Sequence, residues 1–365
     1  MAERTHINEL LKICVETCNA AVDQISNSND QPTEKTNDPR PSLAIVHKDL
    51  LSLLALTYAS TTKIALVLKP SSPTYSAAVT PLNDLIKHIS ALAHCVTLFH
   101  PAEDGATLKQ EVTHLVTDVA AALKGLFQTF LEIDRTDGAE YLMRTGAVHQ
   151  LIEEARSSSG VSKDNVSAVL KKWKEDVEPL EDGVRELKEL IDNVGDVEGE
   201  ADGWDELGLE PDTPLAESEV DRASKVHLVL RLSALLHKRI SSDILKRSSD
   251  TIIPAHQVLD RMPSLSQNLL SAADELVATS HSPQDPSIMG ANLHDIQAVI
   301  RSIETAVHQF FPEESVETAI EDLSLKDGGS AIKSSKKKKW FDGCFEQLAK
   351  AVGTAQASFS DPEVQ

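Results

Sequence analysis

The fold class follows from one stretch of the chain, residues 107–131, which reads TLKQEVTHLVTDVAAALKGLFQTFL. Its apolar residues recur at intervals of three and four, so they line one broad stripe of a helix that spans the whole stretch. Thr107 is the expected N-cap, and Gln110 three residues later completes a capping-box pattern. The stripe consists of Leu108, Val112, Leu115, Val119, Leu123, Leu126, Phe127, Phe130 and Leu131.

The same helical spacing recurs along the rest of the chain. Proline marks several boundaries: Pro70 and Pro73 follow one helical pattern, and Pro179 predicts a kink or break within another. The sequence has no sustained alternation of apolar and polar residues bounded by turn residues, which is the signal of a strand. The chain is therefore predicted to be all-α, with further helices over 5–26, 43–68, 80–99, 139–157, 163–194, 217–247, 252–280, 289–311, 313–323 and 340–359.

The composition favours helical cores built from aliphatic side chains. The chain has 365 residues, of which 41% are hydrophobic but only 4% aromatic. β-Sandwiches and barrels depend more on β-branched and aromatic residues. A chain of this length is expected to form two domains. We predict two antiparallel helical bundles of four or five helices each, over 1–194 and 216–365.

An acidic stretch separates the two predicted bundles. Between Glu189 and Asp221 the chain has thirteen Asp or Glu residues and no Lys or Arg. A segment this acidic, and punctuated by glycine, cannot bury enough apolar surface to fold alone. Residues 195–215 are therefore predicted to form a flexible acidic linker.

The linker carries the candidate partner-binding residues Trp204, Leu207 and Leu209 on an otherwise charged strip. Two interpretations remain open for them. The three side chains fold back onto a groove of the chain's own bundle, or they dock into a partner protein. Thr213, which precedes Pro214, is a candidate site for a proline-directed kinase, and phosphate there would add negative charge.

The formal net charge is −22 and the pI is about 5.0. This charge repels phosphate backbones, so no direct binding to nucleic acid is expected. The exception is a basic run, which we expect in a loop at 333–339: Lys333, Lys336, Lys337, Lys338 and Lys339. It is either a nuclear-import signal or a solvated loop that balances the acidic surface.

The sequence lacks the patterns that accompany common catalytic chemistry. It has no Gly-rich phosphate loop with Lys, no His-Glu-x-x-His helix and no Gly-x-Ser-x-Gly elbow. The four cysteines (Cys14, Cys18, Cys95 and Cys344) are scattered and lack further zinc ligands at a suitable spacing. We therefore predict no catalytic residue, no cofactor and no metal site, and a non-enzymatic protein.

The longest apolar stretch, residues 50–68, contains Lys63 and several hydroxyl side chains. A membrane span requires about 20 mostly apolar residues without a central charge. The stretch is therefore predicted to be a buried bundle helix, and no membrane span is expected.

Three segments together resemble the cyclin-D-binding protein family. They are LLSLLALTYASTTK at Leu50–Lys63, the helix start GATL at Gly105–Leu108, and DRASK at Asp221–Lys225, which follows the acidic stretch and opens the second bundle. The similarity of layout extends over about residues 43–245.

Members of that family interact with D-type cyclins and with helix-loop-helix regulators. The resemblance implies a protein-interaction regulator of cell-cycle progression and transcription, found in nucleus and cytoplasm, with helical bundles like those of vinculin. No basic recognition helix precedes a helical pair, so DNA contact is not expected. The alternative function is a cytoskeletal scaffold of the vinculin and catenin kind, which needs a basic face that only residues 333–339 offer.

Overall fold

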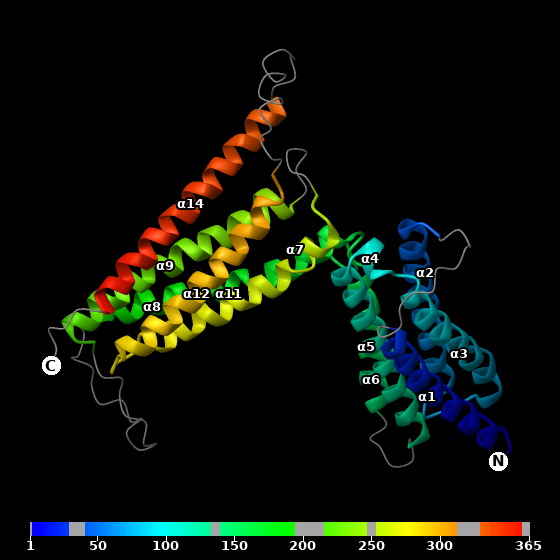
Figure 1. Ribbon diagram of the computed structural model, residues 1–365. Helices are drawn as coiled ribbons and strands as arrows, with labels where there is room; N and C mark the ends of the chain where they lie inside the picture. Colours follow the sequence, from blue (N-terminus) through cyan, green and yellow to red (C-terminus); the bar gives the residue numbers. More distant parts are fainter. Residues whose placement is uncertain are drawn as a thin grey trace, which may run out of the picture. The chain divides into compact units, whose positions relative to one another are not determined.

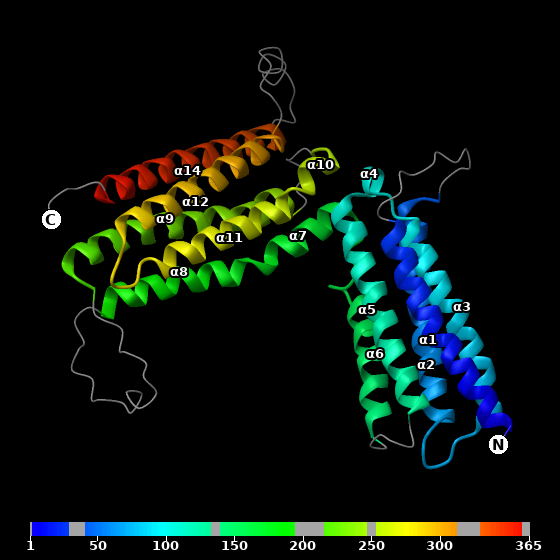
Figure 2. The same cartoon turned by 60° about the horizontal axis from the view of Figure 1, so that its bottom comes forward.

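The computed structural model describes residues 2–28, 41–132, 139–193, 215–246, 253–311 and 329–359. Every regular element among these residues is a helix (Figures 1 and 2), so the all-α prediction is confirmed. Contacts divide the chain into two compact units, Met1–Ala168 and Val169–Gln365.

The helices of the N-terminal unit form a closed ring. Helix α1 packs against α3 and α5, α3 packs against α2, and α6 joins α2 to α5. A single turn, α4, leads into α5. The bounds are α1 (Ala2–Ser28), α2 (Leu43–Val67), α3 (Tyr75–Thr97), α4 (Pro101–Asp104), α5 (Ala106–Leu131) and α6 (Glu140–Arg156).

The core of this unit confirms the stripe read from residues 107–131, with one adjustment. Leu108, Val112, Leu123 and most of the other stripe residues are buried. Leu115 is only partly buried, and Val116 beside it takes the core position. A helix has 3.6 residues per turn, so a neighbouring residue replaces the expected one as the stripe drifts around the axis.

The start of α5 is capped from a distant residue. Its N-cap is Gly105, at φ +94°, and the predicted N-cap Thr107 lies inside the first turn. The backbone N–H of Leu108 donates to Asn165 Oδ1 at 3.0 Å. A Cβ on residue 105 would lie 1.9 Å from Asn165 Cγ, so only glycine leaves room for this cap. The capping box expected from Gln110 is therefore replaced by a tertiary contact.

The C-terminal unit also closes a ring of five helices. Helix α9 packs against α8 and α14, α12 packs against α14 and α11, and α11 packs against α8. Helix α7 precedes α8, a π-helical turn η3 ends α9, and the short α10 precedes α11. The bounds are α7 (Asn165–Glu175), α8 (Val177–Asp192), α9 (Glu217–Ile240), η3 (Ser241–Leu245), α10 (His256–Leu259), α11 (Met262–Ala278), α12 (Pro286–His308) and α14 (Gly329–Phe359).

The boundary between the units differs from the one expected at residue 194. The predicted helix 163–194 breaks at Asp176, and its second half, α8, packs against α9 and α11 of the C-terminal unit. The division therefore lies at Ala168, because the apolar face of α8 meets the second ring. Residues 194–214, most of the predicted linker, lie outside the described residues, whereas Leu215 is buried.

Two further boundaries differ from the sequence prediction. Helix α3 begins at Tyr75, five residues before the expected start, and includes Pro81. The lysine run expected in a loop lies within α14, which begins at Gly329 instead of 340. Lysine is a good helix former, so a basic run does not by itself interrupt a helix.

Within the described residues, α2 is the single helix long and apolar enough to cross a membrane. It packs against α3 and α6, and its buried positions include Thr57, Ser60 and Thr61. The hydroxyl of Thr61 donates to the carbonyl of Thr57 at 2.8 Å, which satisfies it within the helix. A bundle helix and a membrane helix share this length and composition.

Candidate interaction surface

Helix α9 has apolar residues on two faces. The inner face is buried, with Val226, Val229 and Leu230 in the core. The outer face carries Leu228 and Leu235, which are 46% and 45% exposed. Together with Leu232 they follow the i, i+4, i+7 spacing of a stripe on one helix face. The inner face alone supplies the buried core residues of α9, so the core does not account for the second apolar stripe.

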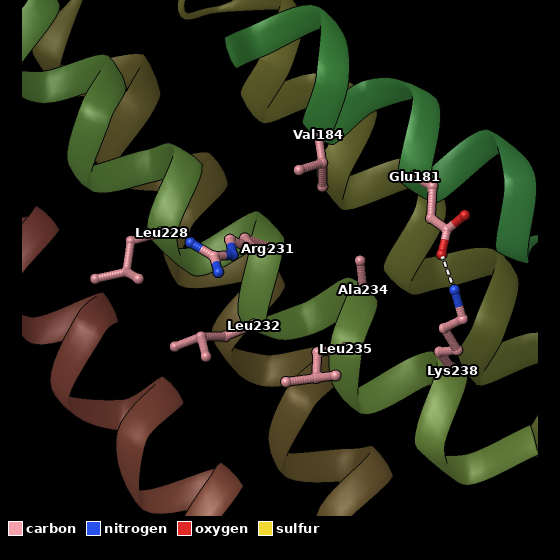
Figure 3. Close-up of a pocket in the computed structure, with 8 residues that line it drawn as sticks. All are labelled: Glu181, Val184, Leu228, Arg231, Leu232, Ala234, Leu235 and Lys238. Atoms are coloured by element: carbon pink, nitrogen blue, oxygen red, sulfur yellow. Dashed lines mark hydrogen bonds and ion pairs between the residues drawn. The ribbon is translucent and has the colours of Figure 1, made fainter. Parts of the chain in front are cut away.

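The outer stripe of α9 forms one side of a groove of about 520 Å³. Figure 3 shows the three leucines and Arg231 along α9, with Glu181 and Val184 coming from α8. We call this surface the α9 groove; it is lined by Glu181, Val184, Leu228, Arg231, Leu232, Ala234, Leu235 and Lys238. Its apolar residues span about 10 Å along the helix axis, which is two helical turns.

The α9 side of the groove is basic in a chain that is strongly acidic. From Arg222 to Ser242 the sequence has five Lys or Arg residues and no Asp or Glu. Lys238 pairs with Glu181 across the groove at 2.7 Å, whereas Arg231 has no ion-pair partner among the described residues. At physiological salt, charges farther away than about 8 Å are largely screened. The cations of α9 therefore act on a group that docks along the α9 side, whereas the opposite wall, α8, has six Asp or Glu and two Lys or Arg residues.

The basic character continues onto α14. The Arg239 guanidinium lies 4.7 Å from the centre of the Trp340 ring and pairs with Asp243 at 2.8 Å. Lys337 Nζ donates to the Asp243 carbonyl at 3.2 Å. Lys336 and Lys339 are exposed, Lys337 and Lys338 are half-buried, and the Lys333 side chain is not described. The lysine run is therefore a helical surface that is partly fixed by contacts to the end of α9.

A polar cluster is buried beneath α9. Trp173 stacks on His237 with ring centres 4.4 Å apart and donates from Nε1 to the His237 carbonyl at 3.0 Å. His237 Nε2 lies 2.7 Å from Ser266 Oγ, which donates to Asp176. Burial lowers the pKa of His237 to about 4, so the ring is neutral at pH 7.

This cluster contains Ser, His and Asp, but its arrangement is not that of a nucleophile and its base. Ser266 Oγ lies between His237 and Asp176, and both Ser266 and His237 are 1% exposed. A nucleophile needs access to substrate and a base oriented by a third group. The cluster instead joins α7, α9 and α11 within the core.

The described cysteines are buried thiols. Burial raises the pKa of Cys14 and Cys18 to about 12 and that of Cys95 and Cys344 to about 11. A thiol that stays protonated is a poor nucleophile and metal ligand. Within the described residues no group of three His, Cys, Asp or Glu side chains could hold a metal ion.

The predicted site residues divide into two groups. Trp204, Leu207, Leu209 and Thr213 lie outside the described residues, as does most of the linker. The lysine run is described and lies beside α9. Sequence reasoning missed the α9 groove, although a signal was present: residues 226–236 carry more apolar side chains than one helix face can hold.

The chain matches two protein-family models. No curated protein sequence matches it significantly. One model, described as Grap2 and cyclin-D-interacting, N-terminal, matches residues 49–193. A second, described as Grap2 and cyclin-D-interacting, C-terminal, matches residues 200–305. The two matches cover more than half of the chain and extend over both units, and the chain therefore belongs to the family of Grap2 and cyclin-D-interacting proteins.

Proposed function

We propose that this protein is a non-enzymatic regulator of cell-cycle progression and transcription that binds D-type cyclins or helix-loop-helix proteins. The observation that carries the proposal is the family match over both units, at residues 49–193 and 200–305. An all-helical chain of two five-helix rings offers long exposed helix faces, which are common binding surfaces for other helices.

The proposal also takes the protein to be non-catalytic and to act in nucleus and cytoplasm. Its support is the lack of recognisable catalytic patterns in the sequence and, among the described residues, a Ser-His-Asp cluster that is buried and wrongly arranged for nucleophilic attack. α2 is taken as a bundle helix, which its packing between α3 and α6 supports.

Calorimetric titration of the purified full chain with a purified D-type cyclin, and separately with a helix-loop-helix domain, tests the partner class. We expect saturable binding to at least one of them, with no binding to an unrelated helical protein of equal charge. Absence of binding to both, with the chain shown to be folded by circular dichroism, would remove the proposed partners.

The second candidate function is a cytoskeletal scaffold, which the two five-helix rings and the basic surface of α14 favour. Cosedimentation with filamentous actin and with vesicles containing about 30% anionic lipid distinguishes the two functions. Binding to either that is lost when Lys336, Lys337, Lys338 and Lys339 are changed to Ala would favour the scaffold.

The lysine run also gives a testable statement about localisation. Changing Lys336–Lys339 to Ala in a fluorescently tagged full chain should lower the nuclear fraction if the run is an import signal. The control is the same number of changes at exposed lysines elsewhere, such as Lys12, Lys48, Lys87 and Lys350. An unchanged nuclear fraction would show that the lysine run is not an import signal and instead forms part of the solvated surface or the contact with Asp243.

A further inference from the structure

We propose that the α9 groove is the docking site for an acidic amphipathic helix of a partner protein. This inference rests on the proposed function, because it assumes a protein partner and places the contact with that partner in the α9 groove. Its first basis is shape. Leu228, Leu232 and Leu235 form a straight apolar line on the outer face of α9, flanked by α8 (Figure 3).

The spacing of the leucines points to a helix as the occupant. A line of apolar residues at i, i+4 and i+7 is the pattern with which one helix packs into the groove beside another. The line is about two turns long, so an occupant with three apolar residues at the same spacing would cover it. Burying leucines that are now nearly half exposed would be favourable, because apolar area is removed from water.

Charge selects an acidic occupant. The α9 side of the groove has no Asp or Glu between Arg222 and Ser242, and Arg231 lies beside the apolar line, on the side nearer α8. Lys238 lies at one end of the groove, and among the described residues that line the groove Glu181 is the one acidic side chain, which pairs with Lys238. Carboxylates on the edge of an incoming helix that lies nearer α8 would meet Arg231 and Lys238, which are seven residues apart on one side of α9, whereas lysines on that edge would meet like charge.

The most exposed apolar residues of the N-terminal unit do not support a similar proposal. In the N-terminal unit Leu66, Leu142 and Met143 are 57–70% exposed on α2 and α6. Their neighbours Glu140 and Arg144 already pair with each other at 3.3 Å. The local charge therefore favours neither an acidic nor a basic partner. The α9 groove is distinguished by its combination of apolar spacing with a side that carries only cations, from Arg222 to Ser242.

A synthetic helical peptide tests the proposal without any assumption about the natural partner. The probe is a labelled peptide of about 18 residues, long enough to form a helix, with Leu at i, i+4 and i+7 positions and Glu and Ala elsewhere. The matched probe has Lys in place of every Glu. Fluorescence anisotropy of each is measured against the full chain at low and at physiological salt.

We expect the acidic peptide to bind at least ten-fold more tightly than the basic one, and to weaken as salt is raised. Leu228→Ser with Leu235→Ser should weaken the acidic peptide at least ten-fold, whereas Leu142→Ser in the other unit should leave it unchanged. Arg231→Glu should shift the preference toward the basic peptide. Equal binding of the two peptides, or no effect of the groove changes, would overturn the proposal.

The chain's own acidic segment is the main rival occupant. If Trp204→Ala, Leu207→Ala and Leu209→Ala combined increase binding of the acidic peptide more than ten-fold, that segment already fills the groove, and the proposal of a foreign occupant is overturned. Cyclin binding is measured in parallel. Cyclin binding that survives the groove changes would leave the proposed function standing and remove only its placement at α9.

Discussion

The two units have the same number of helices in a closed ring, and both bury hydroxyl groups that are satisfied within their own helices, but the C-terminal unit also has a buried cluster of Trp, His and Ser side chains that bonds across helices. In the N-terminal unit the buried hydroxyls of Thr61 and Thr145 donate to carbonyls one turn back in their own helices. In the C-terminal unit the buried groups of Trp173, His237 and Ser266 bond across three helices.

This difference bears on what fixes the position of each helix. A hydroxyl that is satisfied within its own helix leaves that helix free to slide as far as apolar packing allows. A polar bond between helices is lost on sliding, and an unsatisfied buried polar group costs about 1–3 kcal/mol. The C-terminal ring is thus held in one register by polar bonds as well as by packing, beneath the surface that we propose for docking.

The chain itself allows the units to be followed separately. All three Trp residues (Trp173, Trp204 and Trp340) lie in the range of the C-terminal unit, and all three Tyr residues (Tyr58, Tyr75 and Tyr141) lie in the N-terminal unit. Tryptophan fluorescence therefore follows unfolding of the C-terminal unit, while far-ultraviolet circular dichroism follows both.

Trp173→Ala should have the largest effect on stability. It removes a fully buried indole, its stacking on His237 and the donor to the His237 carbonyl, so a loss of about 4 kcal/mol is expected. Urea unfolding followed by Trp340 fluorescence measures it. Phe127→Ala is the matched change in the N-terminal unit, where only packing is lost; because that unit has no Trp, its urea unfolding is followed by circular dichroism. A smaller loss for Trp173→Ala than for Phe127→Ala would contradict the importance of the polar cluster.

Acid should weaken the C-terminal unit through His237. The folded pKa is about 4, below the ordinary value of 6.5, so the unfolded chain binds a proton that the folded chain does not. Stability is then full above pH 6.5 and falls as pH drops toward 4, by at most about 3 kcal/mol.

Urea titrations at pH 7, 6, 5 and 4, followed by Trp fluorescence, test this. His237→Phe keeps a ring against Trp173 but cannot titrate, so its stability should depend less on pH between 6.5 and 4. An identical pH dependence in the two proteins would assign the acid sensitivity to other groups, such as the partly buried His227, whose pKa burial also lowers.

Gly105→Ala should destabilise the N-terminal unit by a smaller amount. The left-handed backbone at φ +94° costs about 1–3 kcal/mol for a residue with a Cβ, and the new methyl group would displace the Asn165 cap. Thermal unfolding by circular dichroism should shift to lower temperature. Gly146→Ala in α6, where an added Cβ meets nothing, is the control and should be neutral or slightly stabilising.

Leu228→Ser and Leu235→Ser should have the smallest effect on stability, about 1 kcal/mol each, because both side chains are nearly half exposed and lose only part of a leucine's burial. The same changes are expected to have the largest effect on peptide binding. A stability loss above about 2 kcal/mol in urea unfolding would instead show that these leucines belong to the core of the C-terminal unit.

The helices themselves could be predicted from the sequence to a large extent. The stripe from Leu108 to Phe130 lies in the core except for Leu115, and Pro179 correctly signalled a break in the helix pattern, which falls at Asp176. The candidate site was harder to predict from the sequence than the helices were. Its predicted apolar residues Trp204, Leu207 and Leu209 lie outside the described residues, so the structure does not test them. The predicted lysine run lies on a helix, because charge alone does not distinguish a loop from a helix surface.

The sequence by itself determined that this protein is all-α, where most helices lie and which residues share a helix face, because these properties depend on local spacing. Only the tertiary structure decided that α8 packs with the C-terminal ring, that Asn165 caps α5, and that Leu228, Leu232 and Leu235 stay on the outside of α9. Periodicity shows that two faces of a helix are apolar. Which face is buried depends on the neighbours that residues far along the chain supply.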